Sequence, residues 1–248
     1  FLIEPKGASV PEMIERGVVI YHQLGKILRE RGLSTLLGDE GGYAPKLRDE
    51  QQALDLMMEA IERSGYTPGT DVELGLDCAA SEFFDPTLQR YMIHAEKGVT
   101  SAGMVEYLQE LTRTYPLRTI EDPLSEDDWD GWTMITEKIG QERLIIGDDL
   151  FVTSRARLER GIQQKAGNAI LIKPNQIGTL TETLATIRLA QEHIFPTIVS
   201  HRSGETSDST LIDIALGTGS PWVKIGAPAR GERVAKYNRL LEWWERER

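Results

Sequence analysis

The chain is 248 residues long, with 40% hydrophobic and 27% charged residues, a composition typical of a globular protein with a sizeable core. This length suits one large domain or two small ones, and a single α/β barrel runs to about 250 residues. The formal net charge of −11 disfavours general nucleic-acid binding and binding to anionic membranes, because both need a basic surface. We therefore expect no nucleic-acid partner and no membrane partner.

The single cysteine and the first residues bear on the compartment. Cys78 has no second cysteine to pair with, which excludes an intramolecular disulfide framework and predicts a reducing, cytoplasmic location. No run approaches the ~20 apolar residues that cross a bilayer, and the start lacks the basic region of a signal peptide. Since the sequence opens without Met inside an apolar run, we expect a chain that is entered partway through a larger protein or has been trimmed.

Short apolar runs alternate with longer segments of helical periodicity, without a linker or a repeat, so we expect one domain over residues 1–248. Strands separated by helices indicate βα units and a parallel sheet, and most runs are apolar throughout, as strands covered on both faces are. A closed barrel is favoured, with an open doubly wound sheet as the alternative. The expected strands are residues 1–5, 72–77, 117–121, 144–148, 169–173, 197–201 and 222–225, with 34–38 as a candidate eighth.

The segments between the apolar runs are expected to be helices. Ser9 and Glu12 have the spacing of a capping box, which predicts a helix that starts there and ends near Gly32. The other expected helices are residues 49–64, 101–115, 129–139, 154–161, 179–192 and 230–246.

An ionisable residue lies at the end of each of six apolar runs. In a barrel, the carboxyl ends of the parallel strands face one mouth, where active sites are built. Six residues that are far apart in the sequence are therefore expected to meet in one place. They are Asp77, Glu121, Asp148, Lys173, His201 and Lys224.

Three of the six, Asp77, Glu121 and Asp148, are carboxylates on consecutive strands. Packed together without compensation, they would repel one another and some would take up protons. A hard divalent cation such as Mg²⁺ binds carboxylate oxygens and removes that conflict. For any one of these acids alone, the favoured interpretation is that it caps the next helix or pairs with a lysine. For three acids in register on neighbouring strands, we expect a metal site.

The two lysines, Lys173 and Lys224, follow apolar runs and would lie close to a bound cation. Desolvation and a nearby positive charge both lower the pKa of an amine, which a general-base lysine needs near neutral pH. A lysine base beside a metal suggests removal of a proton from a carbon next to a carboxylate, with the charged intermediate held by metal. Ordinary salt bridges to the acids are the alternative for either lysine.

Two further segments carry candidate functional groups. His201, Arg202 and Ser203 form a cluster of donors at a strand end, and because arginine's planar fork matches phosphate or carboxylate oxygens we expect an anion site. A core histidine beside a surface arginine is the alternative. Residues 38–45 form a glycine-rich turn that lacks the lysine and spacing of a P-loop. Either a mobile loop delivers Glu40 as an acid, or the segment is a plain turn between helices.

These motifs together resemble the enolase family, the phosphopyruvate hydratases. The matching stretches follow one another in family order over nearly the whole chain. They are Gly-Asp-Glu-Gly-Gly-Tyr-Ala-Pro at 38–45, Asp-Cys-Ala-Ala-Ser-Glu-Phe at 77–83, Ile-Glu-Asp-Pro at 120–123, Asp-Asp-Trp-Asp-Gly at 127–131, Gly-Asp-Asp-Leu at 147–150, Lys-Pro-Asn-Gln-Ile-Gly-Thr-Leu-Thr-Glu at 173–182 and Ser-His-Arg-Ser-Gly-Glu-Thr at 200–206.

The resemblance implies a lyase reaction of glycolysis, the conversion of 2-phosphoglycerate to phosphoenolpyruvate with loss of water and with two Mg²⁺ ions. It implies that Lys173 takes the C2 proton and that Glu40 helps the C3 hydroxyl to leave. By the same resemblance, the ligands of the first Mg²⁺ are Asp77, Glu121 and Asp148, and the substrate-binding residues are Lys224, His201, Arg202 and Ser203.

The resemblance covers only the carboxyl-terminal barrel of enolases. It implies an α/β fold, a TIM-like barrel of the enolase type that lacks its first strand and the amino-terminal domain. Residues 34–38 would then be a loop, and an empty strand slot would leave two sheet edges exposed. We therefore expect this chain alone to be weakly active or inactive, and the full-length form to be a homo-oligomer.

Two alternative functions remain open at this point. The chain could be a non-catalytic scaffold or binding protein on an enolase barrel. It could also be another enzyme of the superfamily that takes a proton from a non-phosphorylated acid, although the anion cluster at 201–203 argues against that.

Overall fold

The computed structural model describes residues 1–93 and 98–247. Its main sheet has seven strands in the order β1-β2-β5-β6-β7-β8-β9. β1 runs antiparallel to β2, and every later pair of neighbours is parallel. The strands are β1 (Leu2–Pro5), β2 (Val72–Asp77), β5 (Leu117–Glu121), β6 (Leu144–Gly147), β7 (Ala169–Ile172), β8 (Thr197–Ser200) and β9 (Trp222–Lys224).

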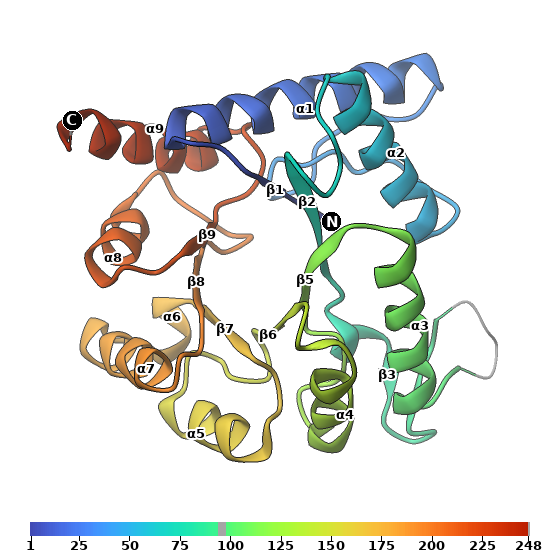
Figure 1. Ribbon diagram of the computed structural model, residues 1–248, viewed down its shortest axis with the longest axis vertical. Helices are drawn as coiled ribbons and strands as arrows, with labels where there is room; N and C mark the ends of the chain where they lie inside the picture. The colour runs from blue at the N-terminus through green and yellow to red at the C-terminus, as the bar shows by residue number, and fades with distance from the viewer. Residues whose placement is uncertain (94–97, 248) are drawn as a thin grey trace.

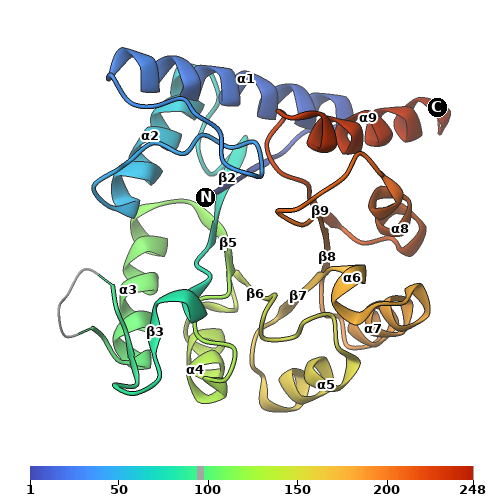
Figure 2. The same cartoon turned by 180° about the vertical axis from the view of Figure 1, so that it is seen from behind.

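Helices lie outside the sheet and form a ring around its strands (Figures 1 and 2). Each parallel strand after β2 is reached through at least one helix, as parallel pairing requires. β3 (Phe84–Asp85) and β4 (Arg90–Tyr91) pair in a separate small sheet after a 3-10 turn at Ala80–Phe83. The helices are α1 (Val10–Glu30), α2 (Glu50–Arg63), α3 (Ser101–Thr114), α4 (Trp129–Ile139), α5 (Arg155–Gln164), α6 (Pro174–Ile177), α7 (Leu180–Glu192), α8 (Thr210–Thr218) and α9 (Gly231–Arg246).

Side-chain caps fix where the long helices begin. The Ser9 hydroxyl accepts from the Glu12 N–H at 3.4 Å, and the Glu12 carboxylate accepts from the Ala8 N–H at 2.8 Å. The capping box therefore forms, with its return bond one residue earlier than the usual one. Asp49 caps α2 by accepting from the Gln52 N–H at 2.8 Å. Such caps satisfy N–H groups that a helix start leaves without a partner.

The hydrophobic core occupies both faces of the sheet. Strand residues such as Ile145, Ile170 and Val199 belong to a large cluster that also contains the buried helix residues. Successive side chains of a strand point to opposite faces, so their neighbours form a second, smaller cluster. That cluster consists of the strand residues Leu144, Ile146, Ala169, Leu171 and Ile198. This two-sided burial explains why the strands are apolar throughout.

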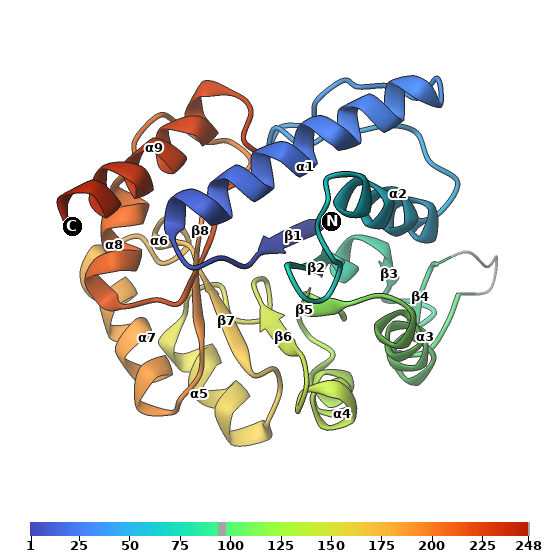
Figure 3. The ribbon, with the colours of Figure 1, turned by 45° about the horizontal axis from the view of Figure 1, so that its top comes forward.

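The sheet curls but does not close on itself within the described part of the chain. There, β1 pairs with β2 alone and β9 pairs with β8 alone. α1 packs against β1, α2 and α9, and it lies across the outside of this opening (Figure 3). The structure thus confirms an α/β barrel of seven strands that lacks one strand, as the resemblance implied, rather than a closed barrel.

The predicted elements form within a few residues of their expected bounds, but the direction of β1 differs and several short elements, among them β3 and β4, were not predicted. A fully parallel sheet is wrong at β1, because an apolar run does not encode strand direction and β1 leads to β2 through two consecutive helices. Residues 34–38 form the loop that the resemblance implied and no eighth strand, and Leu37 makes only an isolated bridge to Tyr43. α6 and α8 were not predicted, since α6 has only four residues and α8 is apolar over most of its length, without a clear polar face. Among the described residues, none of the helices is both long and apolar enough to cross a bilayer.

The core can be tested at Trp132 on α4, which is fully buried and donates its ring N–H to the Ser125 carbonyl at 3.0 Å. We expect Trp132→Ala to lower the free energy of unfolding by about 3 to 5 kcal/mol, the usual cost of deleting a buried aromatic side chain. Met134→Ala on the same helix is the control, because Met134 is 42% exposed and should change stability by less than about 0.5 kcal/mol. Urea denaturation followed by circular dichroism measures both variants, and equal losses would contradict this account of the core.

Candidate active site

The residues predicted to converge all lie at one end of the sheet. Asp77 and Glu121 are the last residues of β2 and β5 and are register partners. Because parallel strands end at the same edge, the remaining residues lie at this end too. Lys224 is the last residue of β9, and Asp148, Lys173 and His201 directly follow β6, β7 and β8.

Lys224 joins two of the predicted metal-binding carboxylates. Its ammonium donates to Asp77 at 2.7 Å and to the two Glu121 oxygens at 2.9 and 2.8 Å. The side chains of Lys224 and Glu121 are only 10% and 1% exposed, so this ion pair is buried. Since β9 is paired with neither β2 nor β5, Lys224 reaches them across the mouth of the curled sheet. Asp77 and Glu121 therefore lie close enough to share one positive charge.

Lys173 contacts the third carboxylate of the predicted set. Its ammonium donates to Asp148, whose other oxygen accepts from the Gln176 side-chain amide at 3.0 Å. The side chains of Lys173 and Asp148 are 14% and 10% exposed. The salt-bridge alternative for the two lysines is thus the arrangement seen in this structure.

Without a bound metal, the pKa of Lys224 is raised, whereas the sequence predicts a lowered pKa in a site that holds a cation. Burial acts to lower the pKa of its ammonium, but Glu121 and Asp77 together outweigh burial and raise it above its usual value. Burial also raises the pKa of the Glu121 carboxyl well above its usual range, against the opposing effect of Lys224. The raised pKa of Lys224 shows that these two acids favour a neighbouring positive charge.

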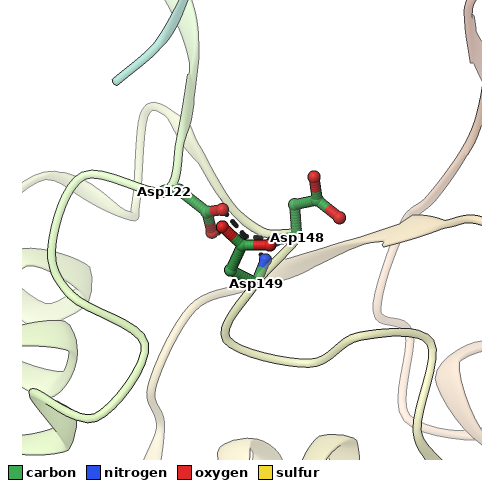
Figure 4. A group of neighbouring side chains, drawn as sticks. All are labelled: Asp122, Asp148 and Asp149. Atoms are coloured by element: carbon green, nitrogen blue, oxygen red, sulfur yellow. Dashed lines mark hydrogen bonds between the residues drawn. The ribbon is translucent and has the colours of Figure 1, made fainter. Parts of the chain in front are cut away.

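A second group of acids, Asp122, Asp148 and Asp149, has one oxygen from each carboxylate within 4.8 Å of the others. Asp122 accepts from the backbone N–H groups of Asp148 and Asp149, both at 2.9 Å, and burial raises its pKa to about 7. Figure 4 shows the Asp122 and Asp149 carboxylates beside each other and that of Asp148 directed away from them. This all-oxygen donor set fits a hard divalent cation. It contains only Asp148 of the predicted ligands, and the set of Asp77, Glu121 and Asp148 stays a prediction.

Glu40 lies beside the predicted anion cluster. Its Oε2 is 3.4 Å from His201 Nε2, and its Oε1 accepts from the Ser203 hydroxyl at 3.3 Å. The interaction with the His201 side chain lowers the pKa of Glu40 to about 2 against the effect of burial, and the charge of Lys224 adds to this. Glu40 is therefore ionised at neutral pH. Arg202 is exposed and donates to the Asn175 side chain at 3.1 Å.

Two glycines let the loops of the site approach one another. Gly41 and Gly226 both have φ of +81°, a conformation that favours glycine. A Cβ on Gly226 would lie 2.7 Å from the Glu40 carbonyl oxygen, and one on Gly41 would lie 2.7 Å from the Ala229 carbonyl oxygen. The Ala227 N–H donates to the Glu40 carbonyl at 2.9 Å. The backbone at Glu40 is thereby held against the connection between β9 and α9.

Five residues that support the site were not identified from the sequence. Asp122, Asp149 and Gln176 could have been noticed, because each lies within a few residues of a predicted site residue in one of the motifs. Arg233 and Lys236, on α9, are fully buried cations that contact residues 201–206. The one sequence signal for them is that they lie three residues apart, which places both on the same face of the helix.

The fold and the site define an α/β barrel protein with acids and lysines gathered at the carboxyl ends of its strands. Residues 1–246 match the family model described as enolase, C-terminal TIM barrel domain. The match spans nearly the whole chain, and the chain belongs to this family. The family and the group of Asp122, Asp148 and Asp149 together indicate enolase-superfamily function with a divalent metal.

The buried pair of Lys224 and Glu121 can be tested by removing one partner at a time. We expect Lys224→Met to lower the free energy of unfolding by about 3 to 5 kcal/mol in metal-free buffer, because it leaves the Glu121 carboxyl buried without its cation. The double variant Lys224→Met/Glu121→Gln should recover much of that loss. Urea denaturation in the presence of a chelator compares the variants, with Lys138→Met on the exposed face of α4 as control. A double variant no more stable than the single one would rule out the unpaired charge as the cause.

Proposed function

We propose that this chain is the catalytic barrel of an enolase, a phosphopyruvate hydratase that converts 2-phosphoglycerate to phosphoenolpyruvate and water. One observation carries the proposal. Lys173 contacts the buried acid Asp148 at one end of the sheet. A second acid, Glu40, lies at the same end and is held in place by His201 and Ser203 from another loop. Proton removal from one carbon and departure of a hydroxyl from the next need two such groups.

The substrate would bind through cations and donors at the mouth. 2-phosphoglycerate carries a phosphate and a carboxylate, and Lys224, His201, Arg202 and Ser203 provide an ammonium, an imidazole, a guanidinium and a hydroxyl. The guanidinium of Arg202 is exposed and donates to the neutral side-chain amide of Asn175, so it can turn to a phosphate and bind two of its oxygens. These local donors are compatible with a net charge of −11, because binding depends on the charge close to the substrate.

Lys173 takes the proton from C2 in this proposal. The amine must be neutral and must give up its hydrogen bond to Asp148 before it can act as the base. The carboxylates of Asp77, Glu121 and Asp148 would hold Mg²⁺, which supplies positive charge to stabilise the charge that develops on the substrate carboxylate. Their oxygen donors and the raised pKa of Glu121 support this assignment, since carboxylates that resist ionisation alone are stabilised by a cation.

Glu40 acts on the C3 hydroxyl. With a pKa of about 2, it is ionised before substrate binds, and the negative charges of the bound substrate act to raise that pKa. Glu40 takes up a proton from solvent once the bound substrate has raised its pKa, and the proton balance is complete when the C2 proton goes to Lys173 and the hydroxyl leaves as water with the proton from Glu40. The electron pair of the broken C2–H bond then forms the C2–C3 double bond.

The setting of the protein belongs to the same proposal. We infer a cytoplasmic enzyme of glycolysis whose full-length form is a homo-oligomer, with no nucleic-acid or membrane partner. We expect the 248-residue chain alone to be weakly active or inactive. Support comes from the two strand edges, on β1 and β9, that have no partner within the described residues.

The proposal is tested at Lys173, by a reaction that a weakly active chain can still report. With Mg²⁺ in D₂O, we expect nuclear magnetic resonance to show exchange of the C2 proton of 2-phosphoglycerate for deuterium. Lys173→Met should slow this exchange by about 100-fold or more, since general-base catalysis contributes at least that factor. Lys138→Met is the control and should exchange at the wild-type rate. Exchange that persists unchanged in Lys173→Met would refute the assignment, and absence of exchange in the full-length form would favour the scaffold alternative.

Metal binding is tested separately at Asp148. A ligand that binds only the folded state at about 100 times its dissociation constant stabilises it by about 2.7 kcal/mol, so Mg²⁺ should raise the melting temperature of the chain. Asp148→Asn should abolish most of this rise, whereas Asp130→Asn, at an exposed position of α4, should keep it. Differential scanning calorimetry with and without a chelator measures the effect. An equal rise in all three proteins would show that the ion binds elsewhere.

A further inference from the structure

Arg233 is a cation enclosed by the loops of the site. It lies in the first turns of α9 and is 0% exposed. One guanidinium nitrogen bonds to His201 Nδ1 at 2.9 Å and to the Arg202 carbonyl at 2.7 Å. The other donates to the carbonyls of Asp39 at 3.0 Å and Ser203 at 2.7 Å. None of these four acceptors is a carboxylate, so the hydrogen bonds themselves must offset the cost of burying the charge.

The contact with Arg233 decides which nitrogen of His201 carries the proton. A guanidinium has only donors and keeps its proton in proteins, so His201 Nδ1 must be the acceptor and must be unprotonated. The proton of the neutral ring then lies on Nε2. That atom is buried and has no hydrogen-bond partner among the described residues, although the Glu40 carboxylate is 3.4 Å away. His201 thus presents an N–H donor to the site, close to Glu40 but without a well-aligned hydrogen bond.

The same guanidinium joins two loops that are far apart in the sequence. The carbonyl of Asp39 directly precedes Glu40, and the carbonyls of Arg202 and Ser203 belong to the loop after β8. Lys236, one helical turn further along α9, is also 0% exposed and donates to the Thr206 carbonyl. α9 therefore anchors the loop after β8 at two points, and through Arg233 it also fixes the distance from that loop to Glu40.

We propose that Arg233 is a positioning residue, which holds His201 as the neutral Nε2–H tautomer and keeps the Glu40 loop in register with residues 201–203. His201 then acts as a hydrogen-bond donor to an anionic oxygen, and it neither gives up nor takes a proton during the reaction. That this oxygen belongs to the substrate rests on the proposed function. The tautomer and the coupling of the loops stand on the contacts of Arg233 alone.

The tautomer is tested by nuclear magnetic resonance of the ¹⁵N-labelled ring at neutral pH, with the His201 signals assigned from their absence in His201→Gln. In the wild-type chain we expect an unprotonated Nδ1 and a protonated Nε2. Arg233→Met should lose this single pattern, and Arg233→Lys should retain it, because an ammonium can still donate to Nδ1. A proton on Nδ1 in the wild-type chain, or an unchanged pattern in Arg233→Met, would overturn the proposal.

The coupling of the loops is tested by amide hydrogen exchange with mass spectrometry on the same variants. We expect residues 38–45 and 200–206 to exchange at least about 10-fold faster in Arg233→Met and in Arg233→Lys, since neither side chain can bond three carbonyls at once. Core segments such as α4 should exchange at the wild-type rate, as should every segment in the control Arg246→Met, an exposed position of α9. Acceleration spread evenly over the molecule, or none, would show that Arg233 has no local role.

These readouts use the unliganded chain and need no turnover, so they separate this inference from the proposed function. If the wild-type chain shows no exchange of the C2 proton of 2-phosphoglycerate, the expected protonation pattern of the His201 ring is the same. Conversely, an unchanged His201 pattern in Arg233→Met would remove the positioning role even where Lys173 proves to be the base.

Discussion

The direction of the parallel strands is the constraint on which the rest of the structure depends. Six consecutive strands, β2 and β5 to β9, run the same way, so their carboxyl ends meet at one mouth. Residues that end those strands are brought together whatever their separation in the sequence. Lys224 lies 147 residues from Asp77 along the chain and still donates to it. The apolar clusters on both faces of the sheet hold this arrangement, because no strand can shift without exposing one of them.

The convergence of acids creates an electrostatic problem that the chain solves with lysines. Asp77, Glu121 and Asp148 would destabilise one another if they were left unpaired in a buried mouth. Lys224 compensates the first two, and Lys173 compensates the third. The upward shifts in the two pKa values have different causes: burial raises the pKa of Glu121, whereas the neighbouring carboxylates of Glu121 and Asp77 raise the pKa of Lys224. An acidic barrel mouth of this kind is suited to divalent cations, in accord with the family to which the chain belongs.

Behind the mouth, a second layer of interactions holds the loops in place. The backbone of Glu40 is held by Ala227 and by glycines that allow close approach, and the buried cations of α9 hold residues 201–206. These contacts place Glu40 within reach of His201 and Ser203 and so give it an unusually low pKa. The acidity of Glu40 is therefore a property of the packed loops and of the helix that supports them.

The sequence by itself determined the elements and their end residues. Apolar runs predicted the strands, and helical periodicity predicted the helices, with the capping box at Ser9 marking the start of the first. The ionisable residues at strand ends predicted the convergence. All of these are local patterns. Tertiary structure alone decided the direction of β1, the reach of Lys224 across the mouth, its raised pKa, and the burial of Arg233 and Lys236. These depend on distances between segments that are not neighbours in the chain, and on how much water remains around each charge. No local pattern carries that information.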